Sequence, residues 1–409
     1  MVWLVRIGKA FRYRVYPTSK QIARLGAWEG ALRFLWNLAL EQRLMGLVRP
    51  HDDRRYPTAF DQINQLTELR AELPWLADVP RNVCAQLLVE LDRAWQRCFA
   101  KLARAPRWKR RGRDGINFCE PHPKVWRLDG DTVRFPKLGT LRAVVHRPLE
   151  GKGKTCTLTR DGTQWFVSIA CDVERPDPAP RESPVVAIDR GVVNAIGDSD
   201  GRLVAAPRHL EQALARLAVA QRAVSRKPKG SKNREKAKAR VAVLHRKVRR
   251  QREHFLHVLS SGYAKSHGVV VLEKLQIGNM VKANSGLARG ILDAGWGKFA
   301  DMLRYKMTWT GGSVVEVPAT YSSQTCSACG CVDALSRPTQ AVFSCSSCGN
   351  RDHADLNAAK VLLARANRSG KPAEGTALEA TRRSRKRVGL RVPRRPLESR
   401  HLAASAGGG

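Results

Sequence analysis

The chain has 409 residues, with 73 Lys and Arg against 36 Asp and Glu, and a formal net charge of +37 at pH 7. Its 43% of apolar side chains can build several cores, which excludes a disordered acidic chain and a short disulfide scaffold. So high a positive charge requires a polyanionic partner, and nucleic acids and anionic membranes are the commonest. No apolar run approaches the roughly 18 residues of a membrane-spanning helix, and residues 1–12 lack a signal-peptide pattern. We therefore expect a cytoplasmic protein without a membrane partner.

The amino-terminal part is predicted to be one strand followed by a helical block. Residues 11–16 alternate large apolar with basic side chains, as a strand with one buried face does. Apolar spacings near three and four then predict helices over residues 19–43, 58–73 and 83–102, the first of them capped by Ser19.

The next segment, residues 125–173, changes to a period of two. Its short runs are separated by the turn signals Asp129-Gly130, Leu138-Gly139 and Asp161-Gly162, which predicts a small antiparallel sheet or barrel. The strand at 11–16 has no partner near it in sequence. We therefore expect it to join this barrel, which makes the helical block an insertion.

The remainder has an α/β pattern. Residues 185–188 and 269–272 are unbroken apolar runs, typical of central strands whose two sheet faces are both covered. A long basic hairpin of helices at about 207–265 lies between them, and a helix at about 298–310 follows. The tail, residues 368–409, is rich in Arg, Pro, Gly and Ser, and we expect it to be disordered.

Four cysteines form two C-x-x-C-G motifs separated by 15 residues, Cys326 with Cys329 and Cys345 with Cys348. Two thiolates three residues apart can bind one ion, and the glycine after each pair tolerates the positive φ of a tight turn. Thiolate-only tetrahedra suit zinc or iron, and nothing in the sequence suggests electron transfer, so we expect one structural Zn²⁺ with no open coordination position. Cys331 is expected to be a spare thiol, although it could replace Cys329.

Three acids stand where burial disfavours a charge. Asp189 ends one apolar run and Glu273 ends the other, and Asp355 begins a helix after the cysteine motifs. A single such acid is more often a turn residue or a helix N-cap. Taken together, three carboxylates on two strands and one helix are able to hold two Mg²⁺ ions, the arrangement used for phosphodiester hydrolysis.

Two basic segments are candidate nucleic-acid contacts. Residues 222–252 hold 14 Lys and Arg with one acid, and their apolar stripe leaves the other helix face for phosphate. Residues 107–113 carry a tryptophan among five basic residues, which could stack on a base unless that tryptophan belongs to a core. The expected contacts are Arg107, Trp108, Lys109, Arg110, Arg111, Arg246, Lys247, Arg249 and Arg250.

Six segments form a set that matches one family. They are Phe11-Arg-Tyr-Arg-Val-Tyr16-Pro, Val186-Ala-Ile-Asp-Arg-Gly-Val-Val-Asn194, Val271-Leu-Glu-Lys-Leu275, Asp293-Ala-Gly-Trp-Gly-Lys-Phe299, Tyr321-Ser-Ser-Gln-Thr-Cys326 and Asp355-Leu-Asn-Ala-Ala359. Together they resemble the insertion-sequence-encoded TnpB proteins and the compact type V CRISPR effectors that descend from them. The resemblance covers nearly the whole chain up to about residue 367. One departure is Arg190, which replaces the aliphatic residue common after the first Asp.

This resemblance implies an RNA-guided DNA endonuclease whose RuvC-type, RNase-H-like nuclease domain contains an inserted zinc ribbon. By position, Asp189, Glu273 and Asp355 match the family's catalytic triad and would hold the two Mg²⁺ ions. The implied partners are a guide RNA and a double-stranded DNA target bearing a short flanking motif.

The implied fold is a multidomain α/β protein with an all-β wedge barrel and a helical insertion that serves as a recognition domain. The expected boundaries are 1–16 and 118–182 for the barrel, 17–117 for the recognition domain, 183–322 for the nuclease domain, 323–352 for the ribbon and 353–367 for the last nuclease helix.

Two other functions share this fold. A guided DNA-binding protein or repressor that does not cleave would be favoured by loss of a triad acid, and all three acids are present. A DNA strand-transfer transposase would act on transposon ends without RNA. The sequence shows no helix-turn-helix or finger array, which fits recognition by base pairing rather than by protein side chains.

Overall fold

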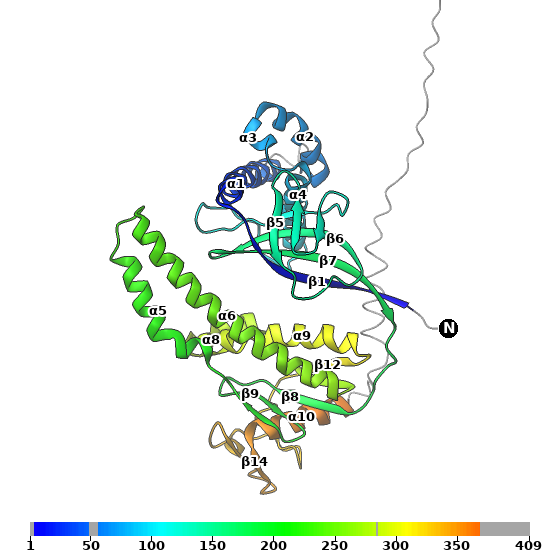
Figure 1. Ribbon diagram of the computed structural model, residues 1–409. Helices are drawn as coiled ribbons and strands as arrows, with labels where there is room; N and C mark the ends of the chain where they lie inside the picture. The colour runs from blue at the N-terminus through cyan, green and yellow to red at the C-terminus, as the bar shows by residue number, and fades with distance from the viewer. Residues whose placement is uncertain (1–3, 49–55, 284, 369–409) are drawn as a thin grey trace, which may run out of the picture. The chain divides into compact units, whose positions relative to one another are not determined.

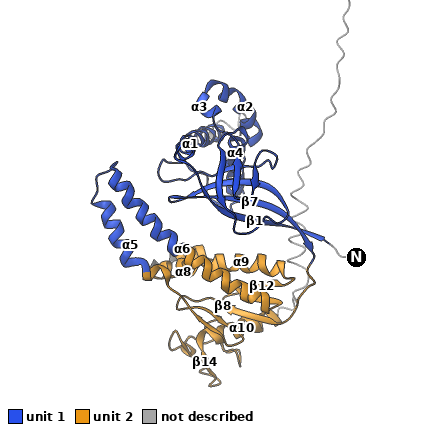
Figure 2. Ribbon diagram, viewed as in Figure 1, with its two compact units in different colours: residues 1–177, 213–249 blue, residues 178–212, 250–409 orange. Residues whose placement is uncertain are grey.

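The computed structural model describes residues 4–48, 56–283 and 285–368 (Figure 1). The tail predicted to be disordered lies outside the described residues, except for Arg368. The chain divides into two compact units, one of residues 1–177 and 213–249 and one of residues 178–212 and 250–409 (Figure 2). No helix in the described ranges is long and apolar enough to cross a membrane.

The first unit contains a seven-stranded antiparallel sheet with the order β2-β6-β7-β1-β5-β4-β3. Its strands are β1 (Leu4–Tyr16), β2 (Phe118–Glu120), β3 (Arg127–Asp129), β4 (Thr132–Phe135), β5 (Gly139–Val144), β6 (Lys152–Asp161) and β7 (Gln164–Pro176). The opening strand pairs with β7 along residues 4–15 and with β5 at residues 14–16, so it lies inside this sheet. Its alternating apolar residues Phe11, Tyr13 and Val15 are buried.

The helical block lies between β1 and β2 in the chain. Its helices are α1 (Ser19–Val48), α2 (Ala59–Glu72), the single turn α3 (Pro74–Ala77) and α4 (Arg81–Phe99). The predicted cap of α1 was one residue off. Thr18, not Ser19, accepts a hydrogen bond from the main-chain N–H of Gln21, and the Gln21 side chain accepts one from the N–H of Thr18, as in a capping box.

The second unit contains a five-stranded mixed sheet with the order β10-β9-β8-β11-β12. Its strands are β8 (Val185–Asp189), β9 (Asn194–Asp198), β10 (Leu203–Ala205), β11 (Val269–Lys274) and β12 (Ser313–Pro318). β11 is parallel to both of its neighbours, β8 and β12, whereas β9 is antiparallel to both of its neighbours, β8 and β10. The two apolar runs of the sequence are therefore central strands, as expected for runs with both faces covered.

Each face of this sheet has its own apolar cluster. One face carries Val186, Ile188, Val270 and Leu272, which pack with α6 (Lys232–Ser266) and α9 (Trp296–Trp309). The other face carries Ala187, Val271 and Val317, which pack against Leu362 of α10 (Ala354–Arg368). Because side chains alternate along a strand, residues 189 and 273 belong to the α10 face.

The remaining elements connect these strands. The basic hairpin consists of α5 (His209–Ser225) and α6, and its residues 213–249 are grouped with the first unit. The short helices α7 (Ile277–Ala283) and α8 (Ser285–Ala294) precede α9. Between β12 and α10 lies a cysteine-bearing segment with β13 (Val342–Ser344) paired antiparallel to β14 (Arg351–His353).

Candidate active site and metal centre

Asp189 and Glu273 lie next to each other at the carboxyl ends of two parallel strands. β8 and β11 are in register from Val185 opposite Val269 to Ile188 opposite Leu272, which makes the two acids the next pair along the strands. Glu273 is only 6% exposed, and Asp189 is partly buried. Ligand sites of parallel sheets form at these carboxyl ends.

Asp355 reaches the same place from the first turn of α10. On the other side of Asp189, its antiparallel partner in β9 is Gly197. A Cβ atom on Gly197 would lie 2.8 Å from the Cβ of Asp355 and 3.1 Å from its main-chain oxygen. The glycine therefore lets α10 approach the sheet closely enough to bring the third acid beside the first. Asp355 is 8% exposed.

The grouping of these acids is visible in the electrostatics of Asp189. Burial, followed by repulsion from Glu273 and then from Asp355, raises the pKa of Asp189 to about 8 from its ordinary 3.8. Burial likewise raises the pKa of Glu273, while Arg190 opposes this shift. The site thus favours a bound cation, because a cation relieves both the desolvation and the repulsion.

Three residues of this site were not predicted to have a role in it. The Asn194 amide donates a 2.8 Å hydrogen bond to Asp355, and Arg337 lies 3.7 Å from the other oxygen of that carboxylate. Arg190 is buried beside Glu273, with its Nε 3.9 Å from Oε1. Asn194 and Arg190 stand inside a motif of the sequence, but Arg337 has no local sequence signal.

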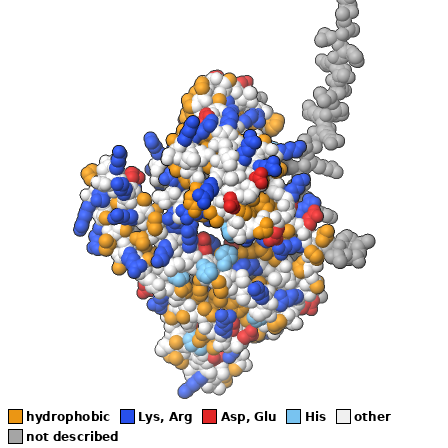
Figure 3. Space-filling model, in the orientation of Figure 1, with side chains coloured by type: hydrophobic (Ala, Val, Ile, Leu, Met, Phe, Trp, Pro, Cys, Tyr) orange, Lys and Arg blue, Asp and Glu red, His pale blue; other side chains and the backbone are white. Residues whose placement is uncertain are grey.

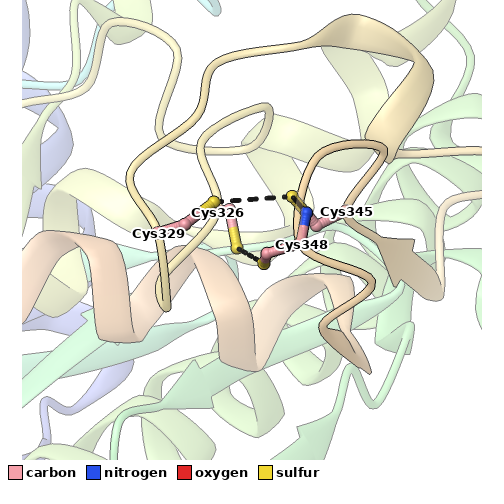
Figure 4. Close-up of side chains that lie close together, drawn as sticks. All are labelled: Cys326, Cys329, Cys345 and Cys348. Atoms are coloured by element: carbon pink, nitrogen blue, oxygen red, sulfur yellow. Dashed lines mark hydrogen bonds between the residues drawn. The ribbon is translucent and has the colours of Figure 1, made fainter.

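The four predicted cysteines come together as one cluster (Figure 4). The four sulfur atoms, one each from Cys326, Cys329, Cys345 and Cys348, all lie within 4.8 Å of one another. Among the described residues, no other group of three or more His, Cys, Asp or Glu side chains brings its ligand atoms so close together. Cys331 is outside this cluster, as expected for a spare thiol.

The turns of the two cysteine motifs have the expected geometry. Gly330 and Gly349 have φ values of 78° and 73°, which confirms the prediction of positive φ after each pair. The N–H of Cys348 donates to the sulfur of Cys345, and this main-chain bond is the first cause that lowers the pKa of the Cys345 thiol to about 6. A lowered pKa favours the thiolate that binds metal.

The cysteine-bearing segment is tied to the helix that carries Asp355. Asn357 of α10 is fully buried, donates a 2.8 Å hydrogen bond to the main-chain oxygen of Thr325 and accepts a 2.9 Å bond from the N–H of Ser327. The apolar core of this segment consists of little more than Cys326, Cys345, Phe343 and Ala354. So small a core is typical of segments that a bound metal ion stabilises.

The basic hairpin has the predicted abundance of Lys and Arg on its surface (Figure 3). One predicted contact is wrong, however. Arg246 is 7% exposed, and it donates a 2.7 Å hydrogen bond to the main-chain oxygen of Asp161. Arg249 pairs with the carboxylate of the same residue, whereas Lys247 is exposed. Arg246 therefore anchors the turn between β6 and β7 and is not available to phosphate.

The segment at 107–113 lies against α1. Trp108 is 43% exposed, so the alternative of a core tryptophan is excluded. Lys109 is half-buried with its Nζ 4.3 Å from the centre of the Trp36 ring, and its main chain exchanges two hydrogen bonds with Asn37. Arg110 and Arg111, by contrast, are exposed.

Three family profiles match the chain. One described as "Probable transposase" matches residues 168–284, and one described as "Cas12f1-like, TNB domain" matches residues 296–362. A third, described as "Helix-turn-helix domain", matches residues 7–44, contrary to our expectation that the sequence contains no helix-turn-helix. In the structure this segment is strand β1 followed by the single uninterrupted helix α1.

Two curated proteins are similar to this chain over most of its length. The chain is 32% identical over 375 residues to a protein of Escherichia coli (strain K12) named "Putative RNA-guided DNA endonuclease InsQ", covering 87% of this chain and 92% of the relative. It is 34% identical over 365 residues to a "Putative RNA-guided DNA endonuclease" of Streptomyces pristinaespiralis, covering 88% and 89%. The chain therefore belongs to the TnpB family, as the sequence motifs predicted.

The fold is similar to that of a solved complex of Cas12f1 with guide RNA and target DNA. The TM-score is 0.53 at 12% identity, and the alignment covers 87% of this chain and 98% of that one.

Proposed function

We propose that this protein is an RNA-guided DNA endonuclease that hydrolyses DNA paired to its guide RNA beside a short flanking motif. The observation that carries the proposal is the meeting of Asp189, Glu273 and Asp355, from two strands and one helix, on one face of the mixed sheet. Three acids gathered without sufficient counter-charge are costly to the fold. Clusters of buried acids with shifted pKa values are typical of functional sites, where the activity of the protein requires them despite their cost in stability.

The acids fit Mg²⁺ as ligands, because they supply hard carboxylate oxygens at a site where burial and then repulsion raise the pKa of Asp189, and a cation relieves both. We propose that Asp189, Glu273 and Asp355 hold two such ions in a RuvC-type, RNase-H-like nuclease domain. When bound, the ions would activate a water molecule and stabilise the leaving oxygen of the phosphodiester. Asn194 orients the carboxylate of Asp355 by donating to one of its oxygens.

The cysteine cluster fits Zn²⁺. Four sulfur atoms each about 2.3 Å from one ion at the corners of a tetrahedron lie about 3.8 Å apart. The Cys326 and Cys348 sulfurs are 3.7 Å apart, and so are those of Cys329 and Cys345. We propose one structural Zn²⁺ that holds the ribbon and, through Asn357, the start of α10.

The guide RNA and the target DNA explain the net charge of +37. We propose that the seven-stranded sheet is the wedge barrel, that the helical block at 17–117 is the recognition domain, and that the exposed members of the predicted basic contacts bind phosphate. Because the relatives come from bacteria, where DNA lies in the cytoplasm, we propose that the protein acts there.

The first experiment is to express the protein with its native flanking DNA, purify it, and sequence the nucleic acid that copurifies. A discrete RNA with a constant scaffold and a variable guide end is expected. The purified complex should then cleave a matching DNA in Mg²⁺, and Asp189→Ala should lose cleavage while keeping target binding.

Each of the other outcomes points to another function. Guided binding without cleavage by the wild type would identify a repressor. Heterogeneous RNA, or none after a moderate salt wash, together with joining of transposon ends would identify a transposase.

A further inference from the structure

Arg190 is the residue directly after the first acid, and its guanidinium is buried. The residue is 6% exposed, and burial lowers its pKa, while Glu273, Glu316 and Asp189 oppose that shift in this order. A buried guanidinium destabilises the fold unless it is paired and hydrogen-bonded. Its partners therefore indicate what it does.

The hydrogen bonds of Arg190 go to main-chain oxygens of two other elements. Nη2 donates to the main-chain oxygen of Glu273 at the end of β11, and Nη1 donates over 3.3 Å to that of Trp296, the first residue of α9. In return, the indole Nε1 of Trp296 donates over 3.1 Å to the main-chain oxygen of Gly191. The end of β8, the end of β11 and the start of α9 are thus held together at the site.

The guanidinium of Arg190 makes no hydrogen bond to the carboxylate of Glu273, which instead accepts one from the main-chain N–H of Arg190. The Nε atom of Arg190 lies 3.9 Å from Oε1, too far for a hydrogen bond, and although Nε is buried it has no hydrogen-bond partner among the described residues. The guanidinium therefore supplies positive charge beside the carboxylate without occupying the oxygens that would bind a cation. Arg337 differs, because it approaches the Asp355 carboxylate itself and is partly exposed.

We propose that Arg190 is a positioning residue: by holding the main chain of Glu273 against β8 and α9, it orients the Glu273 carboxylate for a divalent cation. This role rests on the proposed function, since it assumes that Glu273 is a metal ligand. Lysine cannot replace the planar guanidinium, because a single ammonium group does not donate in a fixed fork to two separate carbonyls.

The test compares Arg190→Met and Arg190→Lys with the wild type and with Arg304→Met. Arg304 is a matched control, because it pairs with Glu316 and Asp301 and makes no bond to Glu273. Mn²⁺ binding to the full chain without RNA is followed by electron paramagnetic resonance, and circular dichroism checks that each variant is folded. Single-turnover cleavage and target binding are measured on the RNA complex.

Loss of a ligand-orienting group is expected to weaken Mn²⁺ binding and lower the maximal cleavage rate by about 10- to 100-fold. Both Arg190 variants should show this loss, while target affinity and the Arg304 variant stay within about twofold of the wild type. Arg190→Lys carries the test if Arg190→Met does not fold.

A role of charge alone predicts the opposite sign, because removing a positive charge tightens cation binding. Tighter Mn²⁺ binding by Arg190→Met, or wild-type binding and cleavage by Arg190→Lys, would overturn the positioning role. If the wild type and Asp189→Asn bind Mn²⁺ equally poorly, the proposed metal site itself is wrong. If the wild type and both Arg190 variants bind Mn²⁺ equally tightly, the metal site stands and only the positioning role of Arg190 is wrong.

Discussion

Asp189→Asn should stabilise the metal-free protein while it abolishes cleavage. The substitution keeps the shape of the side chain and removes a charge that burial and two neighbouring acids disfavour. A carboxyl whose pKa in the fold, about 8, lies above its ordinary value of 3.8 stabilises the fold fully below pH 3.8. That contribution is lost as the pH rises toward 8.

The size of the effect follows from the pKa shift. One pKa unit corresponds to about 1.4 kcal/mol. Because Asp189 shares its shift with Glu273 and solvent reaches part of its side chain, we expect a gain of about 2–3 kcal/mol in the free energy of unfolding at pH 7, less at pH 5. For a unit of this size that raises the Tm by about 5–10 °C.

The assay is thermal unfolding of the metal-free full chain at pH 5, 7 and 9, with and without Mg²⁺. Wild type should gain stability from Mg²⁺ and the variant should gain little, because a bound ion stabilises only the form that binds it. The control is Asp301→Asn, whose carboxylate is exposed. A Tm below that of wild type, or an undiminished response to Mg²⁺, would refute the clustering of acids described above.

The other predictions concern the elements that bring the site together. Replacing Cys345 and Cys348 with Ser should release zinc, and elemental analysis that finds the metal unchanged would count against that cluster. Gly197→Ala should reduce cleavage strongly with target binding intact, because its Cβ would meet Asp355 at 2.8 Å; a wild-type rate would mean that α10 can shift freely. Asn357→Ala leaves a buried main-chain oxygen and a partly buried main-chain N–H unpaired and should cost about 1–3 kcal/mol in urea unfolding, so an unchanged midpoint would contradict the link between ribbon and helix.

The four-cysteine cluster could be predicted from the sequence because its geometry is local. Each pair of cysteines is three residues apart, and the glycine that follows takes the positive φ that the turn requires. The three acids were also recognisable, since Asp189 and Glu273 each end an apolar run. In the structure, the register of β8 and β11 then puts both on one sheet face.

What surrounds those acids was decided by the tertiary structure. Arg337 approaches Asp355 from the ribbon, and Arg190 binds main-chain oxygens of β11 and α9, which belong to distant parts of the chain. Arg246 belongs to a run of basic residues whose sequence predicts a phosphate-binding face, yet its guanidinium donates a hydrogen bond to the main-chain oxygen of Asp161, next to the turn between β6 and β7. Charge and periodicity along one helix show that a face is basic. Whether a particular guanidinium meets solvent or a carbonyl depends on which distant segment packs against it, and no local pattern contains that information.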